Sequence, residues 1–362
     1  MLNLHKLLTD VFDPKKGENV IILNDFPSSE KKVDLDYIQR RDMARAWHKA
    51  FQELAKKAHC KVEPIIFYEP TGGDGVPLPE TATQNNKKIN FSKKIKSLSK
   101  KDIVLAITRF SATGPLETSI QKQKFRVASM PGITQDMSAL QADYKIVAKK
   151  ARVLAKKLTN ATAARVIFST GHEVYFDLQK RKAMLDDGQC SKPGQAINFP
   201  SGEAYIALFD EKGSKTQGFI PVFHDNHLLI YEVKENKIID VITDSPKSRE
   251  MQKYFQEDPA RANIAELGLG CNDKAIYINN VLQDEKIEGM HWAYGYNDYM
   301  GGTTKVTHFK NPLNAIHMDI IYTKEAKIKV KQVKLIYENN TEEVIMENSR
   351  YSFNVQKEFE KA

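Results

Sequence analysis

The sequence predicts an α/β protein in which an N-terminal α/β domain with a partly parallel sheet precedes a strand-rich α+β C-terminal domain. Apolar runs alternate with amphipathic helical segments in the first half, a pattern typical of an α/β layer. Short strand-like segments dominate the second half. The 362 residues suffice for two domains of roughly 100–200 residues each. We therefore expect domains at residues 1–165 and 166–362, with the second carrying the catalytic metal site.

The first half begins with a buried strand and a long helix. Residues 19–25 form a short apolar run before Pro27, which predicts a buried strand. Between residues 36 and 59, apolar side chains recur at helical spacing, which predicts an amphipathic helix. Two further strands are expected at residues 62–68 and 103–108, and another long helix at residues 137–158.

The second half changes to strands near residue 160. We expect one helix at residues 247–255 and a hairpin turn at residues 234–237. The expected strands cover residues 165–168, 173–177, 204–209, 218–223, 227–233, 238–242, 314–323 and 326–337.

Composition excludes several classes of protein. Hydrophobic residues make up 41% and charged residues 28%, as in globular proteins. The lysine-rich run at residues 87–101 contains no arginine and one aromatic residue, so a solvated helix face is favoured over a nucleic-acid site. Cys60, Cys190 and Cys271 are too far apart for a zinc knuckle. No signal peptide and no apolar run of about 20 residues is found, so we expect a cytoplasmic protein without membrane partners.

A histidine and a carboxylate stand two residues apart near the C-terminus. His317 and Asp319 are flanked by apolar residues in a segment expected to be a strand. Alternate residues of a strand share one face, so both side chains project together. Imidazole and carboxylate are good ligands for a divalent metal, although the same pair also occurs as a structural hydrogen bond.

Three other residues strengthen the metal hypothesis. The turn sequence Pro-Ser-Gly delivers Glu203 to the start of an apolar strand. Glu266 lies inside the apolar run Ile-Ala-Glu-Leu-Gly-Leu-Gly, where a carboxylate is rarely buried without a cation. His291 lies between apolar neighbours in Gly-Met-His-Trp-Ala-Tyr-Gly. Each has a structural alternative: a salt bridge for the glutamates and a satisfied core position for the histidine.

Taken together, these motifs resemble the thermophilic metallo-aminopeptidase family of aminopeptidase T and aminopeptidase S. The order Pro-Ser-Gly-Glu203, Ile-Ala-Glu266, Gly-Met-His291 and His317-Met-Asp319 is similar in sequence and in character. The segment Phe-Arg-Val-Ala-Ser-Met-Pro-Gly at residues 125–132 is similar to an arginine-and-glycine segment of the family.

The resemblance implies a leucyl-aminopeptidase-like hydrolase with two divalent metal ions (Zn, Co or Mn), peptide substrates and a homodimer. It carries over Glu203, Glu266, His291, His317 and Asp319 as metal ligands. It also implies a tyrosine ligand, for which Tyr299 is preferred over Tyr294 and Tyr296. Glu203 or Glu266 is then expected to move a proton to the leaving amine.

Two alternatives remain open. His291, His317 and Asp319 alone form the two-histidine, one-carboxylate set of mononuclear non-haem iron oxygenases. The dihydroxypyridine ring-opening dioxygenases look like relatives of the same fold and keep a similar His-x-Asp motif. The second alternative is a catalytically silent relative that keeps the fold. The presence of both Glu203 and Glu266 favours two metals and hydrolysis.

Overall fold

The computed structural model describes residues 2–74, 76–179 and 181–362. The chain divides into two compact units, each assembled from segments that are distant in sequence. Unit 1 contains Met1–Ala148, Asp186–Ser201 and Lys274–Gln283, and unit 2 contains Lys149–Leu185, Gly202–Asp273 and Asp284–Ala362. Whereas one boundary at residue 165 was expected, these units interleave along the chain.

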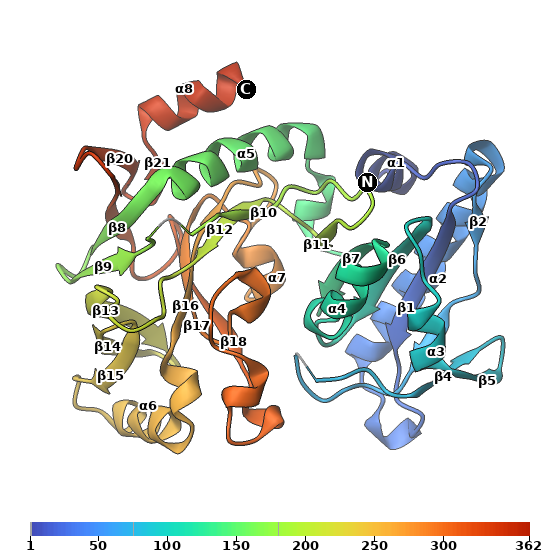
Figure 1. Ribbon diagram of the computed structural model, residues 1–362, viewed down its shortest axis with the longest axis horizontal. Coiled ribbons are helices and arrows are strands. Elements are labelled where there is room, and N and C mark those ends of the chain that lie inside the picture. The colour runs from blue at the N-terminus through green and yellow to red at the C-terminus, as the bar shows by residue number, and fades with distance from the viewer. Residues whose placement is uncertain (1, 75, 180) are drawn as a thin grey trace. The chain divides into compact units, whose positions relative to one another are not determined.

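Unit 1 is built on a mixed sheet with the strand order β11-β7-β6-β1-β3-β4-β5, and β2 also pairs with β1 (Figure 1). The strands β11, β7, β6, β1 and β3 pair in parallel, whereas β4 and β5 are antiparallel. The partly parallel α/β sheet expected from the sequence is therefore confirmed. The strands are β1 (Asn19–Asp25), β2 (Lys61–Val62), β3 (Ile66–Tyr68), β4 (Thr81–Gln84), β5 (Lys87–Asn90), β6 (Asp102–Thr108), β7 (Arg126–Pro131) and β11 (Ala196–Asn198).

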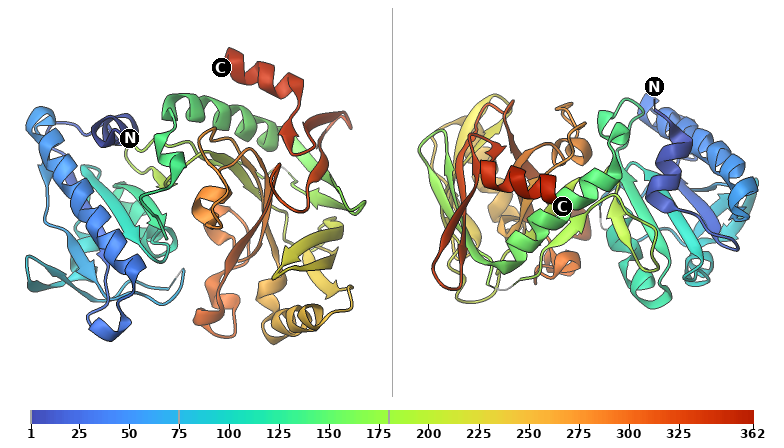
Figure 2. Two further views of the ribbon diagram at one scale, coloured as in Figure 1. Left: turned by 180° about the vertical axis from the view of Figure 1, so that it is seen from behind. Right: turned by 90° about the horizontal axis from the view of Figure 1, so that it is seen from above.

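The longest helix of unit 1, α2 (Leu35–Ala58), covers β1 and β6 (Figure 2). It begins where the side chain of Asp34 accepts a hydrogen bond from the backbone N–H of Tyr37, and it ends at His59 in the left-handed conformation. The remaining helices of unit 1 are α1 (Leu4–Phe12), α3 (Phe91–Lys96) and α4 (Thr113–Gln123), with 3-10 turns at Glu30–Lys32 and Ser138–Gln141. Two helices cross the division between the units, namely α5 (Tyr144–Asn160) and α7 (Val281–Asp284).

Unit 2 contains two antiparallel sheets, as its strand-rich sequence predicts. One has the order β15-β14-β13-β9-β8-β19-β20-β21, and the other has the order β10-β12-β16-β17-β18. The first contains β8 (Ala161–Phe168), β9 (Glu173–Asp177), β13 (Gln217–His224), β14 (His227–Lys234), β15 (Lys237–Val241), β19 (Val330–Tyr337), β20 (Glu342–Glu347) and β21 (Arg350–Tyr351). The second contains β10 (Met184–Asp186), β12 (Glu203–Ala207), β16 (Ile264–Gly270), β17 (Gly289–Gly295) and β18 (His317–Thr323).

Unit 2 also holds α6 (Pro246–Glu257) and α8 (Phe353–Lys361). Its 3-10 turns are Pro259–Ala262, Asp298–Met300, Val306–His308 and Pro312–Asn314. None of the helices in the described part of the chain combines the length and hydropathy needed to cross a membrane. Within the described residues, Cys60, Cys190 and Cys271 take part in no disulfide.

Two expected helices differ from the structure. The helix predicted at residues 137–158 starts later, at Tyr144, because Asp143 accepts a hydrogen bond from the N–H of Lys145 and begins a new helix there. The lysine-rich run is helical only at Phe91–Lys96, since Lys87 and Lys88 lie in the hairpin strand β5.

Candidate metal centre

Five of the predicted ligands lie on one face of the smaller sheet of unit 2. Strand register pairs Glu203 with Gly270, and alternation along β16 places Gly270, Gly268 and Glu266 on the same face. Gly268 pairs with His291 across to β17, and Ala293, two residues further, pairs with Asp319 of β18. His317 lies two residues before Asp319. All five side chains therefore project from four adjacent strands into one layer.

The opposite face of this sheet is apolar and fixes the strands in place. It carries buried side chains from all four strands, among them Ile206, Leu267, Trp292 and Tyr322. The indole N–H of Trp292 donates to the hydroxyl of Tyr322 at 3.1 Å, and that hydroxyl donates to the carbonyl of Pro221 in β13 at 2.8 Å. The alternation that buries these residues also directs the polar residues to the other side.

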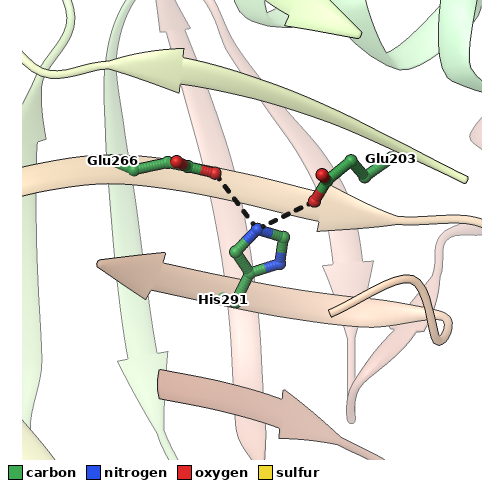
Figure 3. A group of neighbouring side chains, drawn as sticks. All are labelled: Glu203, Glu266 and His291. Carbon is green, nitrogen blue, oxygen red and sulfur yellow. Dashed lines mark hydrogen bonds and ion pairs between the residues drawn. The ribbon is translucent and has the colours of Figure 1, made fainter. Parts of the chain in front are cut away.

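The five residues form two clusters that share Glu266. In the first, the Nε2 of His291 lies 3.1 Å from Glu203 Oε2 and 3.2 Å from Glu266 Oε1 (Figure 3). In the second, the Nε2 of His317 lies 3.1 Å from Glu266 Oε2 and 3.6 Å from Asp319 Oδ1. Within each cluster the candidate ligand atoms lie within 4.8 Å of one another. Each cluster offers one imidazole nitrogen and two carboxylate oxygens, a donor set suited to a divalent metal.

A glycine makes room for His291. A Cβ atom on Gly268 would lie 1.9 Å from the Nε2 atom of His291, so a larger residue there would displace the ring. The second nitrogen of the other histidine is also used, because Nδ1 of His317 lies 2.9 Å from the carbonyl oxygen of Tyr296. This contact fixes the ring so that Nε2 faces the carboxylates.

The electrostatics of the site favour cations. Burial alone would lower the pKa of His291, but its contacts with Glu203 and Glu266 raise it well above the usual value. Burial likewise opposes charge on His317, and Asp319 with Glu266 raises its pKa. Carboxylates that favour a proton on each imidazole also favour a divalent cation, which binds the neutral ring and releases that proton.

One buried oxygen is consistent with this donor set. Glu203 is 3% exposed, and its Oε2 atom pairs with Nε2 of His291 at 3.1 Å. A divalent ion between these two atoms would satisfy both the buried carboxylate and the imidazole. The residues present therefore fit two metal ions. Glu203, Glu266 and His291 surround one position, and Glu266, His317 and Asp319 surround the other.

Tyr299 lies beside the second cluster, whereas Tyr294 does not. The Tyr299 ring, in the turn Asp298–Met300, has its centroid 5.6 Å from that of His317, and the Tyr296 ring lies 6.0 Å from the same imidazole. Tyr294 belongs to the apolar face, where its ring centroid lies 5.4 Å from that of Phe255. The position of Tyr299 is compatible with the predicted tyrosine ligand, and Tyr296 remains its competitor.

Two charged residues of the centre were missed in the sequence. Lys286 is fully buried, and its ammonium group donates to carboxylate oxygens of Glu203 and Glu285. Both residues follow α7, and their backbone packs against Gly270. A Cβ atom added to Gly270 would lie 2.6 Å from the carbonyl oxygen of Glu285. The triplet Asp-Glu-Lys shortly before the buried strand β17 was the available signal, but lysines are too common in this chain for one to stand out.

Other histidines of the second half of the chain lie outside the two clusters. Nδ1 of His172 lies 3.0 Å from the Thr170 hydroxyl, and Nδ1 of His224 lies 3.0 Å from Asp225. His227 is exposed, and His308 accepts a hydrogen bond from the backbone of Lys305. Within the described residues, neither metal-compatible cluster includes any of them.

Similar folds occur among solved structures. A 2,5-dihydroxypyridine dioxygenase from Pseudomonas putida is 15% identical, with a TM-score of 0.66 and 97% of each chain covered. AmpT, the aminopeptidase T of Thermus thermophilus, is 13% identical, with a TM-score of 0.59, covering 96% of this chain and 98% of AmpT. No family model and no curated protein matches the sequence. At these identities the likeness establishes a shared fold.

Proposed function

We propose that the chain is a metal-dependent aminopeptidase that removes N-terminal residues from peptides. The observation that carries the proposal is the shared carboxylate of Glu266. One of its oxygens faces His291 and the other faces His317, at 3.2 and 3.1 Å. A carboxylate between two clusters suits a pair of metal ions that act together on one substrate.

The same observation favours this proposal over the iron oxygenase. A facial triad requires both histidines and one carboxylate around a single metal. Here the two histidines lie on different oxygens of Glu266, and each has its own second carboxylate, Glu203 or Asp319. Two acidic clusters thus support hydrolysis over oxygen chemistry, and the dioxygenase remains the alternative to be tested.

Bound divalent metals would supply Lewis-acid activation of a water molecule and of the peptide carbonyl. Glu203, Glu266 and His291 would hold one ion, and Glu266, His317 and Asp319 would hold the other, with Tyr299 as the proposed further ligand. The three carboxylates would offset most of the positive charge of two divalent ions. A carboxylate oxygen of Glu203 or Glu266 that is not bound to metal would accept a proton from water and return it to the leaving amine. A homodimer is proposed with this activity on the same resemblance.

Metal analysis and peptidase assays test this function. Purified protein is expected to bind two Zn, Co or Mn ions per chain and to hydrolyse leucine p-nitroanilide. Glu203→Ala and His317→Ala should each lose at least one bound metal ion and the activity, whereas His308→Ala, at a histidine outside both clusters, should lose neither. One iron per chain with oxygen uptake on a dihydroxypyridine would establish the alternative, and absence of metal and activity would indicate a silent relative.

A further inference from the structure

Lys286 is the cation that distinguishes the two metal-compatible clusters. Its side chain has no exposed area, and its ammonium group donates to Glu203 Oε1 and to Glu285 Oε1. Lysine is rarely buried fully unless carboxylates pair with it. The backbone carbonyl of Lys286 also accepts a hydrogen bond from the N–H of Asn272 at 2.8 Å, which helps to fix its position.

This contact leaves Glu203 one oxygen for a metal. Oε1 accepts from Lys286, whereas Oε2 pairs with Nε2 of His291 at 3.1 Å. Glu203 is therefore oriented as a ligand through a single oxygen. The ammonium charge also opposes a dication that shares the same carboxylate, because both compete for its negative charge.

The other cluster has the same donor set with different neighbours. Among the described residues, the ion pair of Asp319 is with His317, at 3.6 Å, and no lysine or arginine is found in a salt bridge with it. The side chains of His317 and Asp319 are 12% and 8% exposed, compared with 1% and 4% for His291 and Glu203. A cation at the Glu203–His291 cluster is therefore both closer to a lysine and more fully removed from water.

We propose that Lys286 is a positioning residue that makes the Glu203–His291 cluster the weaker of two unequal metal subsites. This inference rests on the proposed two-metal function and adds the order of loading. The His317–Asp319 subsite fills first, and the Glu203–His291 subsite fills last. The second metal, and with it the complete centre, then depends on the metal concentration around the protein.

Cobalt titration of the full chain tests this order. Isothermal calorimetry and the visible absorption of bound Co²⁺ both report loading without any turnover. The wild type should bind in two steps whose affinities differ about 10- to 100-fold, the range typical of residues behind metal ligands. Glu203→Ala should remove the weaker step and keep the tighter one. Lys286→Met should bring the two affinities within about threefold, whereas Lys286→Arg, which keeps the charge, should leave them apart.

The outcomes separate this inference from the proposed function. Three results would overturn the role of Lys286 while two metals still bind. They are two equal binding steps in the wild type, loss of the tighter step in Glu203→Ala, and an unchanged difference between the two cobalt affinities in folded Lys286→Met. No cobalt binding, or a single site, would instead contradict the two-metal function itself. If Lys286→Met fails to fold by circular dichroism, the wild-type and Glu203→Ala titrations still decide the order.

Discussion

Asp25 and Glu266 are buried carboxylates on β-strands, one in each unit, and their surroundings differ. Asp25 ends β1, and its two oxygens accept hydrogen bonds from the backbone N–H of Arg109 at 2.9 and 3.0 Å. The two oxygens of Glu266 face two imidazoles of separate strands. Backbone donors satisfy the first carboxylate as part of the fold, whereas the second joins groups that bind metals. The neighbours of a buried acid, more than its burial, thus indicate a site.

The largest effect is expected from Glu266→Ala, which removes the ligand common to both clusters. Metal binding should fall from two ions to none at micromolar cobalt, and peptidase activity should fall on the order of 10³-fold or more, since several kcal/mol of Lewis-acid stabilisation disappear. Metal analysis and leucine p-nitroanilide hydrolysis measure both. If Glu266→Ala still bound two ions, Glu266 would be a structural acid like Asp25.

Buried cations extend the comparison to Arg126 and Lys286. The guanidinium of Arg126 is fully buried in unit 1, where it donates to the carbonyls of Phe12 and Cys190 and to Glu18. Arg126→Met removes the ion-pair partner of the Glu18 carboxylate, so we expect a loss of about 3–5 kcal/mol in the stability of unit 1. Urea unfolding measures this loss. The metal count should stay at two, and a variant that lost metal would link Arg126 to the centre.

Asp25 provides a pH-dependent test of the structural acid. Burial raises the pKa of its carboxyl to about 6 although the backbone of Arg109 and the charge of Arg40 lower it. The folded state thus holds the proton more tightly than the unfolded state, and stability falls as pH rises from about 4 to about 6. The difference is about 3 kcal/mol, and Asp25→Asn should abolish it.

The hydrogen-exchange rates of peptides from β1 and β6 measure this change in stability. At each pH, the rate in Asp25→Asn is divided by the rate in the wild type. A ratio that stays constant from pH 4 to 7 would show that Asp25 does not titrate in this range. The metal content of Asp25→Asn should match that of the wild type at every pH, which distinguishes this carboxylate from Glu266.

The smallest expected effect concerns Tyr299. Tyr299→Phe removes the hydroxyl and keeps the ring that packs on His317 at 5.6 Å. If the hydroxyl contributes to the second cluster, cobalt binding at the His317 subsite should weaken about tenfold. Tyr296→Phe is the matched control, because its ring also contacts His317. Weakening in the control alone would transfer the predicted role to Tyr296.

Periodicity predicted much of this fold. The strands at residues 19–25 and 173–177 and the long helix α2 follow from apolar spacing, because burial of one face controls which residues are hydrophobic. The start of α5 was misplaced because the cap at Asp143 follows a 3-10 turn that has similar apolar content. The interleaving of the units depends on contacts distant in sequence, which periodicity does not report.

The candidate centre was partly predictable for a similar reason. His317 and Asp319 share a strand, so local alternation alone predicted that they project together. The meeting of Glu203, Glu266 and His291 depends on strand register, which no single strand contains. Lys286 lies between α7 and β17, outside regular structure, so no pattern indicated its burial or its contact with Glu203.

Gly268 gives the centre a vulnerable point that contains no ligand. Its missing side chain is the space in which the His291 imidazole lies, 1.9 Å from where a methyl group would be. Among relatives of this protein, one that keeps all five proposed ligands but has a larger residue at this position is expected to have lost the first cluster. The size of the residue at this position therefore indicates which related proteins can still bind metal at the first cluster.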